Sequence, residues 1–242
     1  MLKKLLLLAL LVVASEATAQ DGQCIRERAA MVEIIRAYAR SDAGILGPQG
    51  ISESVLEAMG QTERHRFIPV RPCAVAYGDG PVPIGRGQTI SQPFIVALMT
   101  HLAAVKPDDT VLEVGTGSGY QAAVLARLVR KVCTIEIIPP LANAAGKVLR
   151  ELGHDNVSVK VGDGYQGWRE CGPFDAVIVT AALEHVPLPL IEQLKVGGRL
   201  VMPLGAAPAP QQLTVVEKIA PGETRTRSII PVRFVPFTRS RD

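Results

Sequence analysis

The chain has 242 residues, of which 48% are hydrophobic and 20% are charged, and its formal net charge is +3 at pH 7. This length suits one α/β domain with extensions, and the composition is ordinary for a globular protein. The basic residues form no long run, which argues against a nucleic-acid-binding track. We therefore expect a single folded domain that does not bind nucleic acid.

Residues 1–19 have the three regions of a secretory signal peptide. Two lysines precede an apolar stretch from Leu5 to Ala14, and Ala17-Thr18-Ala19 supplies the small residues of a cleavage site. The apolar stretch is too short to span a membrane. Cleavage would leave a mature chain of residues 20–242 that is periplasmic or secreted and has no stable membrane association. The alternative is an apolar N-terminal helix that stays in place.

The four cysteines are Cys24, Cys73, Cys133 and Cys171, and sequence alone leaves three full pairings open. Cys133 lies within an expected core strand, so we interpret it as a small buried hydrophobic residue. Cys24 and Cys73 lie outside the core sheet and could pair in an oxidising compartment. The chain has no C-x-x-C motif and its histidines lack ligand spacing, so we expect no metal site.

The N-terminal part of the mature chain, residues 20–104, is expected to be mostly helical and to lie on the substrate side. Helices are predicted over 25–40, over 53–59 between an N-cap at Ser52 and Gly60, and over 93–104, which begins with a proline. Residues 67–91 are rich in Pro and Gly and have no period. A long irregular stretch of this kind is usually a functional loop.

Strands and helices alternate over residues 105–205, which predicts a cofactor-binding core with a parallel sheet and helices on both faces. The expected strands are 110–114, 132–136, 157–161, 174–180 and 198–203. Residues 206–242 are expected to add two more strands, 212–219 and 228–235, joined through Pro221-Gly222. The fold class is therefore α/β.

A glycine-rich loop, Gly115-Thr116-Gly117-Ser118-Gly119, follows the strand that contains Glu113, and a helical pattern begins directly after it. This succession is typical of nucleotide-binding α/β domains. A dinucleotide-binding loop would have its third glycine at Tyr120, whose side chain prevents the same close approach. The loop therefore fits S-adenosylmethionine better than NAD, and we expect Glu113 and all five loop residues to contact that cofactor.

Two acidic residues at the ends of the next strands are further candidate cofactor ligands. Glu136 ends the second strand, and a carboxylate there can accept hydrogen bonds from both ribose hydroxyls. Asp163 follows the third strand between Gly162 and Gly164, where its carboxylate can accept from the adenine amino group while the glycines leave room for the ring. The alternative for this second motif is an ordinary turn.

Residues 83–93 read Pro-Ile-Gly-Arg-Gly-Gln-Thr-Ile-Ser-Gln-Pro. Together with the glycine loop and Gly162-Asp163-Gly164, this stretch makes the chain resemble the protein-L-isoaspartate O-methyltransferase family from about His65 to Phe237. The resemblance implies a Rossmann-like class I methyltransferase fold. Its seven-stranded, mostly parallel sheet would have helices on both faces, an antiparallel last strand and an N-terminal helical extension.

The resemblance also implies an activity. The family transfers a methyl group from S-adenosylmethionine to the free α-carboxylate of L-isoaspartyl residues, and more weakly of D-aspartyl residues, in damaged proteins. The ester then collapses to a succinimide, which begins repair. The expected partners are isoaspartyl-containing proteins and peptides, and the family's usual cytoplasmic location is the alternative to export. Ser91 takes the position of the active-site serine, and the expected substrate contacts are Thr89, Ile90, Gln92, Thr180 and Ala181.

The chemistry of a carboxylate acceptor agrees with this interpretation of Ser91. A carboxyl group with a pKa of about 3.3–3.9 is already ionised at neutral pH, so the reaction needs alignment and dehydration rather than a strong base. Ser91 precedes Pro93 at a predicted helix N-terminus, where a hydroxyl and free N–H groups suit a carboxylate. We interpret Ser91 as an orienting hydrogen-bond donor; the alternative is a simple helix cap.

Two other functions stay open at this point. The chain could methylate another carboxylate or a small molecule, or it could be a non-enzymatic exported protein that binds exposed peptides.

Overall fold

The computed structural model describes residues 2–41, 50–69, 72–206 and 209–239, with side chains from residue 21 onward. Seven strands form one sheet in the order β5-β4-β3-β6-β7-β8-β9, which confirms the expected α/β architecture. In chain order they are β3 (Thr110–Val114), β4 (Lys131–Glu136), β5 (Val157–Val161), β6 (Phe174–Val179), β7 (Leu194–Leu204), β8 (Gln211–Ala220) and β9 (Glu223–Val232).

The strand directions differ from the expectation at the end of the chain. Strands β3 to β7 are mutually parallel, and β8 is antiparallel to both of its neighbours, β7 and β9. The last strand, β9, therefore runs in the same direction as the first five, and the expectation of an antiparallel last strand was wrong. Strands β7, β8 and β9 are consecutive and adjacent, so short connections force their directions to alternate.

Strand β9 begins five residues before the predicted start at residue 228. Its first part, Glu223–Ser228, is exposed and polar, so it has no apolar alternation that would reveal a strand. Pairing with β8 determines its structure instead, from a turn in which Gly222 has a φ of 79°.

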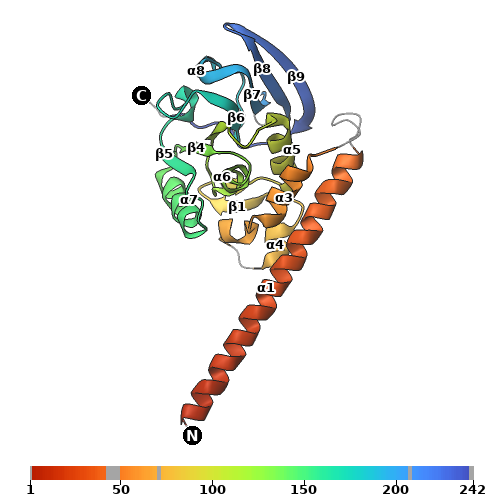
Figure 1. Ribbon diagram of the computed structural model, residues 1–242, viewed down its shortest axis with the longest axis vertical. Helices are drawn as coiled ribbons and strands as arrows, with labels where there is room; N and C mark the ends of the chain where they lie inside the picture. Colours follow the sequence, from red (N-terminus) through yellow and green to blue (C-terminus); the bar gives the residue numbers. More distant parts are fainter. Residues whose placement is uncertain (1, 42–49, 70–71, 207–208, 240–242) are drawn as a thin grey trace.

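Helices cover both faces of the sheet (Figure 1). Val111 of β3 packs in one core together with residues of α5 and α6, whereas Leu112 packs in a second core with residues of α8. This split follows from the alternation of side chains along a strand. The helices are α1 (Leu2–Ser41), α3 (Glu53–Gln61), α4 (Cys73–Tyr77), α5 (Pro93–Ala103), α6 (Tyr120–Ala126), α7 (Pro139–Glu151) and α8 (Leu188–Gln193), with short 3₁₀ turns η1 (Arg64–Phe67) and η2 (Gly164–Gln166).

Helix α1 is the N-terminal extension. It contacts α3, α4 and α5, and its N-terminal half projects away from the rest of the molecule (Figure 1). The helix predicted over 25–40 is thus the end of a single longer helix that also includes residues 2–19. Across the described parts of the chain, no helix combines the length and apolarity needed to cross a membrane. The signal-peptide assignment stays a prediction.

Two local predictions before the core were wrong. Gly60 does not end its helix, because α3 continues to Gln61 and Thr62 donates both its N–H and its hydroxyl to the Ala58 carbonyl. The segment 67–91 is not one long loop, since it contains α4 and an antiparallel pair of strands, β1 (Val82–Gly85) and β2 (Gln88–Ile90). The glycines of this segment make the tight turn of a hairpin.

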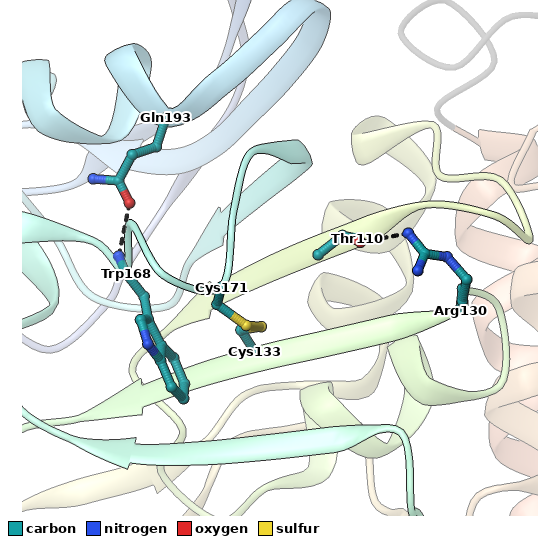
Figure 2. Close-up of a disulfide and its surroundings, with 6 residues drawn as sticks. All are labelled: Thr110, Arg130, Cys133, Trp168, Cys171 and Gln193. Carbon is teal, nitrogen blue, oxygen red and sulfur yellow. Dashed lines mark hydrogen bonds between the residues drawn. A yellow bond between two sulfur atoms is a disulfide. The ribbon is translucent and has the colours of Figure 1, made fainter.

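Both pairs of cysteines form disulfides, Cys24 with Cys73 and Cys133 with Cys171. The first joins α1 to α4, as the sequence allowed. The second corrects the interpretation of Cys133 as a buried residue without a covalent partner. Figure 2 shows Cys133 on β4 bonded to Cys171 in the loop that contains Trp168. The backbone N–H of Trp168 donates to the carboxamide oxygen of Gln193 at 2.7 Å. Only the folded chain brings this loop beside β4, so the pairing had no signal in the sequence.

Candidate active site

The glycine loop between β3 and α6 lies against the end of β6. Gly115 has a φ of +97°, and a Cβ atom at this position would lie 2.4 Å from the Thr180 hydroxyl oxygen. That hydroxyl donates to the Gly115 carbonyl at 2.7 Å. A residue with a side chain would therefore be strained by its backbone conformation and would also clash with Thr180. This close approach fixes one side of the loop.

Glu136, at the end of β4, fixes the other side of the loop. Its Oε2 accepts from the Gly117 N–H at 2.8 Å and its Oε1 accepts from the Ile138 N–H at 2.9 Å. The side chain is only 5% exposed. Each carboxylate oxygen has a second lone pair, so Glu136 can hold the loop and still accept from a ribose hydroxyl.

Glu113 is a fully buried carboxyl group beside the same loop. The hydroxyls of Thr116 and Thr134 are hydrogen-bonded at 2.6 Å, and Thr134 donates to Glu113 Oε2 at 2.6 Å. Glu113 Oε1 has no hydrogen-bond partner among the residues that the structure describes. Burial, with a smaller contribution from the charge of Glu136, raises the pKa of Glu113 to about 8. The group is therefore mostly protonated at neutral pH.

These groups line an open cavity, whose empty space of about 840 Å³ includes solvent at its mouth. It brings together most of the residues that the sequence predicted as cofactor or substrate contacts: Thr89, Ile90, Ser91, Glu113, Gly115, Thr116, Gly117, Ser118, Glu136, Gly164, Thr180 and Ala181. Gly119, Gly162 and Asp163 are not among the lining residues. Gly119 is instead the N-cap of α6.

Asp163 makes two contacts that the sequence did not predict. Its Oδ1 accepts from the Tyr165 N–H at 2.9 Å, and its Oδ2 accepts from Arg239 Nε at 2.9 Å. The Arg239 guanidinium also lies 3.8 Å from the centre of the Tyr165 ring. Asp163 therefore connects the loop after β5 to the C-terminal segment, and its contact with adenine stays a prediction.

The segment Val235–Thr238 also lines the cavity and had no assigned role in the sequence interpretation. Backbone hydrogen bonds at 2.9 Å join Ala182 N–H to the Val235 carbonyl and Phe237 N–H to the Ala182 carbonyl. These bonds bring the C-terminal segment beside the end of β6. Ile137 and Ile138 are further lining residues, and their position directly after Glu136 was the available signal for them.

Ser91 lies where the first cavity meets a second one. Four residues line both cavities: Thr89, Ser91, Thr180 and Val235. The second cavity is also open, and its empty space of about 1050 Å³ includes solvent. The residues that bound it include Gln92, Arg233, Phe234 and three prolines. Ser91 is not the cap of α5, because Gln92 is the N-cap and makes no side-chain capping bond. The side chain of Gln92 donates to Asp79 at 2.9 Å.

Comparison with known proteins identifies the family. The family model described as Protein-L-isoaspartate(D-aspartate) O-methyltransferase (PCMT) matches residues 45–242. Protein-L-isoaspartate O-methyltransferase 2 of Polaromonas sp. is 56% identical over 211 residues, which are 87% of this chain and 100% of the relative.

Two solved structures are also similar. One protein-L-isoaspartate O-methyltransferase has a TM-score of 0.77 and 27% identity; the match covers 86% of this chain and 65% of that one. A putative protein-L-isoaspartate O-methyltransferase from Plasmodium falciparum, solved in complex with S-adenosyl-L-homocysteine, has a TM-score of 0.73 and 24% identity over 88% of this chain and 99% of that one. By its match to the family model and its identity to a full-length relative, this chain belongs to the protein-L-isoaspartate O-methyltransferase family.

Proposed function

We propose that this protein transfers a methyl group from S-adenosylmethionine to the free α-carboxylate of L-isoaspartyl residues, and more weakly of D-aspartyl residues, in damaged proteins. The observation that carries the proposal is the meeting of two cavities at Ser91. One has the carboxylates and glycines that suit a nucleotide-like donor, and the other is large enough for part of a peptide. Membership of the family supports the same activity.

The first cavity fits the methyl donor by its chemistry. Glu136 would accept from the ribose, the loop Gly115 to Ser118 would lie against the donor, and the unpartnered oxygen of Glu113 is available to a cationic group. The bound donor supplies a methyl group already activated by its positively charged sulfur. The chain's own task is to orient the acceptor and to exclude water.

The acceptor side is assigned to Thr89, Ile90, Ser91, Gln92, Thr180 and Ala181. Ser91 and Thr180 line both cavities, so each can contact a carboxylate that reaches from the second cavity toward the first. We assign the Ser91 hydroxyl the role of a donor that holds one carboxylate oxygen, leaving the other oxygen free to attack. The acceptor enters ionised, so no base has to remove a proton from it.

We also propose that the mature protein works outside the cytoplasm. The two disulfides support this location, because such bonds persist in oxidising compartments. The signal-like residues 1–19 point the same way.

The activity is tested with methyl-labelled S-adenosylmethionine, an isoaspartyl peptide and its normal aspartyl twin. We expect label on the isoaspartyl peptide alone, because the aspartyl twin presents no free α-carboxylate at that position. Binding of the donor without methylation of either peptide would contradict the proposal and favour another carboxylate or small molecule as the acceptor. Failure to bind the donor at all would favour a non-enzymatic peptide-binding protein.

Replacing Ser91 with alanine should lower kcat about 10- to 100-fold, the usual range for losing one hydrogen bond to a charged group. The dissociation constant of the cofactor should change much less, because the hydroxyl is assigned to the acceptor. Ser158→Ala, on the exposed edge strand β5, is the matched control and should leave both quantities unchanged. Equal turnover in Ser91→Ala and the wild type would refute an active role for this hydroxyl.

Cofactor binding should tighten about tenfold between pH 7 and pH 9, because the pKa of Glu113 is about 8 and a cationic donor favours its ionised form. The affinity rises with pH because Glu113 must lose a proton when the donor binds. Below pH 8 the binding reaction has to remove this proton, whereas above pH 8 the carboxyl group is already ionised. Isothermal titration calorimetry in buffers of different ionisation enthalpy measures the proton release. Glu113→Gln has no such proton, so its affinity should be nearly independent of pH. The same pH dependence in both proteins would exclude Glu113 as the source.

The intact mass of protein recovered from the native host tests the proposed location. We expect a chain that begins at Gln20 and is about 4 Da lighter than the fully reduced form, because each disulfide removes two hydrogens. A chain that begins at Met1 with four free thiols would contradict export.

A further inference from the structure

Arg64, in η1, is a buried cation without a carboxylate partner. Its side chain is 0% exposed, and the ion pairs found among the described residues do not include it. The ring of Tyr120 lies 4.9 Å from its guanidinium carbon. A cation–π contact offsets part of the cost of burying the charge but does not neutralise it. The positive charge of Arg64 is therefore available to act on its surroundings.

The hydrogen bonds of Arg64 hold its guanidinium next to the site. Its Nε donates to the Ala76 carbonyl at 2.7 Å, and its Nη2 donates to the Ser91 carbonyl at 2.7 Å. Its third nitrogen, Nη1, has no hydrogen-bond partner within the described part of the chain. The guanidinium thus lies directly behind the residue at which the two cavities meet, and its planar shape holds the backbone of Ser91 in one position.

We propose that Arg64 positions Ser91 and selects a negatively charged acceptor by supplying positive potential to the junction of the two cavities. This inference rests on the proposed function, since it concerns the acceptor carboxylate of that reaction. The Arg64 side chain is fully buried and stays a positioning and specificity-determining residue rather than a group that touches the substrate.

The neighbouring charges leave this potential largely intact. Glu113 and Glu136 line the first cavity, where a bound cationic donor offsets their negative charge, and neither lines the second cavity, from which the acceptor reaches Ser91. Asp79, bonded to Gln92, is exposed, so water and salt screen its charge far more than that of a buried group. Arg233 lines the second cavity and is also exposed, so its charge is screened in the same way.

The reaction determines which kinetic quantity Arg64 should affect. The acceptor carboxylate loses its negative charge when it becomes a methyl ester. A fixed positive charge therefore stabilises the bound substrate more than the reacting state or the ester product. Loss of that charge should raise KM for the isoaspartyl peptide, whereas kcat changes less. A methyl ester should also leave more readily than an unreacted carboxylate.

The test measures binding of two peptides to the full-length protein saturated with S-adenosylhomocysteine. One is an isoaspartyl peptide with a free α-carboxylate, and the other is the same peptide with that group converted to an amide. We expect the wild type to bind the carboxylate about tenfold more tightly or better, as expected when a buried positive charge acts on a carboxylate through a protein interior of intermediate dielectric constant. Arg64→Gln should reduce this ratio to near one, while Arg64→Lys, which keeps the charge, should retain most of it.

Arg127→Gln is the matched control, because it removes one positive charge from an arginine bonded to Thr62 rather than to Ser91. Arg64→Met provides a second charge-removing variant if Arg64→Gln does not fold, since its long apolar side chain fills similar space without burying a new polar group. Normal affinity for the cofactor identifies the folded variants.

The outcomes separate this inference from the proposed function. A wild type that does not methylate the isoaspartyl peptide refutes the proposed function. A wild type that methylates it but binds carboxylate and amide equally refutes the role of Arg64. Retention of the full wild-type ratio in a folded Arg64→Gln or Arg64→Met protein, or its loss in a folded Arg64→Lys protein, refutes that role as well.

Discussion

The hydrogen bond from the Gly117 N–H to the Glu136 carboxylate is the contact on which the site depends. Strands β3 and β4 are parallel and in register, so the loop after β3 and the acid that ends β4 emerge side by side at the same edge of the sheet. On the other side, β6 brings Thr180 against Gly115. The loop is thus held between two neighbouring strands, and its glycines permit an approach that no side chain would allow.

Glu113 and Arg64, which are both 0% exposed, contribute to the electrostatic character of the site. Glu113 lies on the cofactor side and is mostly protonated near pH 7, whereas Arg64 lies behind Ser91 and stays charged at any pH of interest. When a cationic donor binds and Glu113 ionises, the two opposite charges offset each other, so the potential of Arg64 still acts on the acceptor. An arriving cationic donor would favour ionisation of Glu113, so the two substrates would each meet a group of complementary charge.

The sequence predicted the elements that are built from local signals. Strands β3 and β5 have the bounds predicted from the sequence, and the glycine loop lies between a strand and a helix as expected. What it could not predict depends on contacts between distant segments. The Cys133–Cys171 bond, the approach of Val235–Thr238 to the cavity and the bond from Arg64 to Ser91 all join parts of the chain that only the folded sheet brings together. The exposed first half of β9 was not predicted as a strand, because its pairing with β8 rather than apolar alternation determines its structure.

The surroundings of Ser91 explain why its substrate has to bring its own nucleophile. Three histidine rings are engaged elsewhere, since His65 contacts the Tyr77 hydroxyl, His101 accepts from the Ser52 N–H and His185 contacts the Tyr165 hydroxyl. Burial also lowers the pKa values of His65 and His101, which makes them weaker bases. The hydrogen bonds found among the described residues pair none of these three rings with Ser91, and a serine hydroxyl that no base activates is a poor nucleophile but a good hydrogen-bond donor. Such a site can use an ionised carboxylate as the acceptor, because this group attacks without losing a proton. If Arg64 selects acceptors by their negative charge, it therefore also selects those that are ready to react.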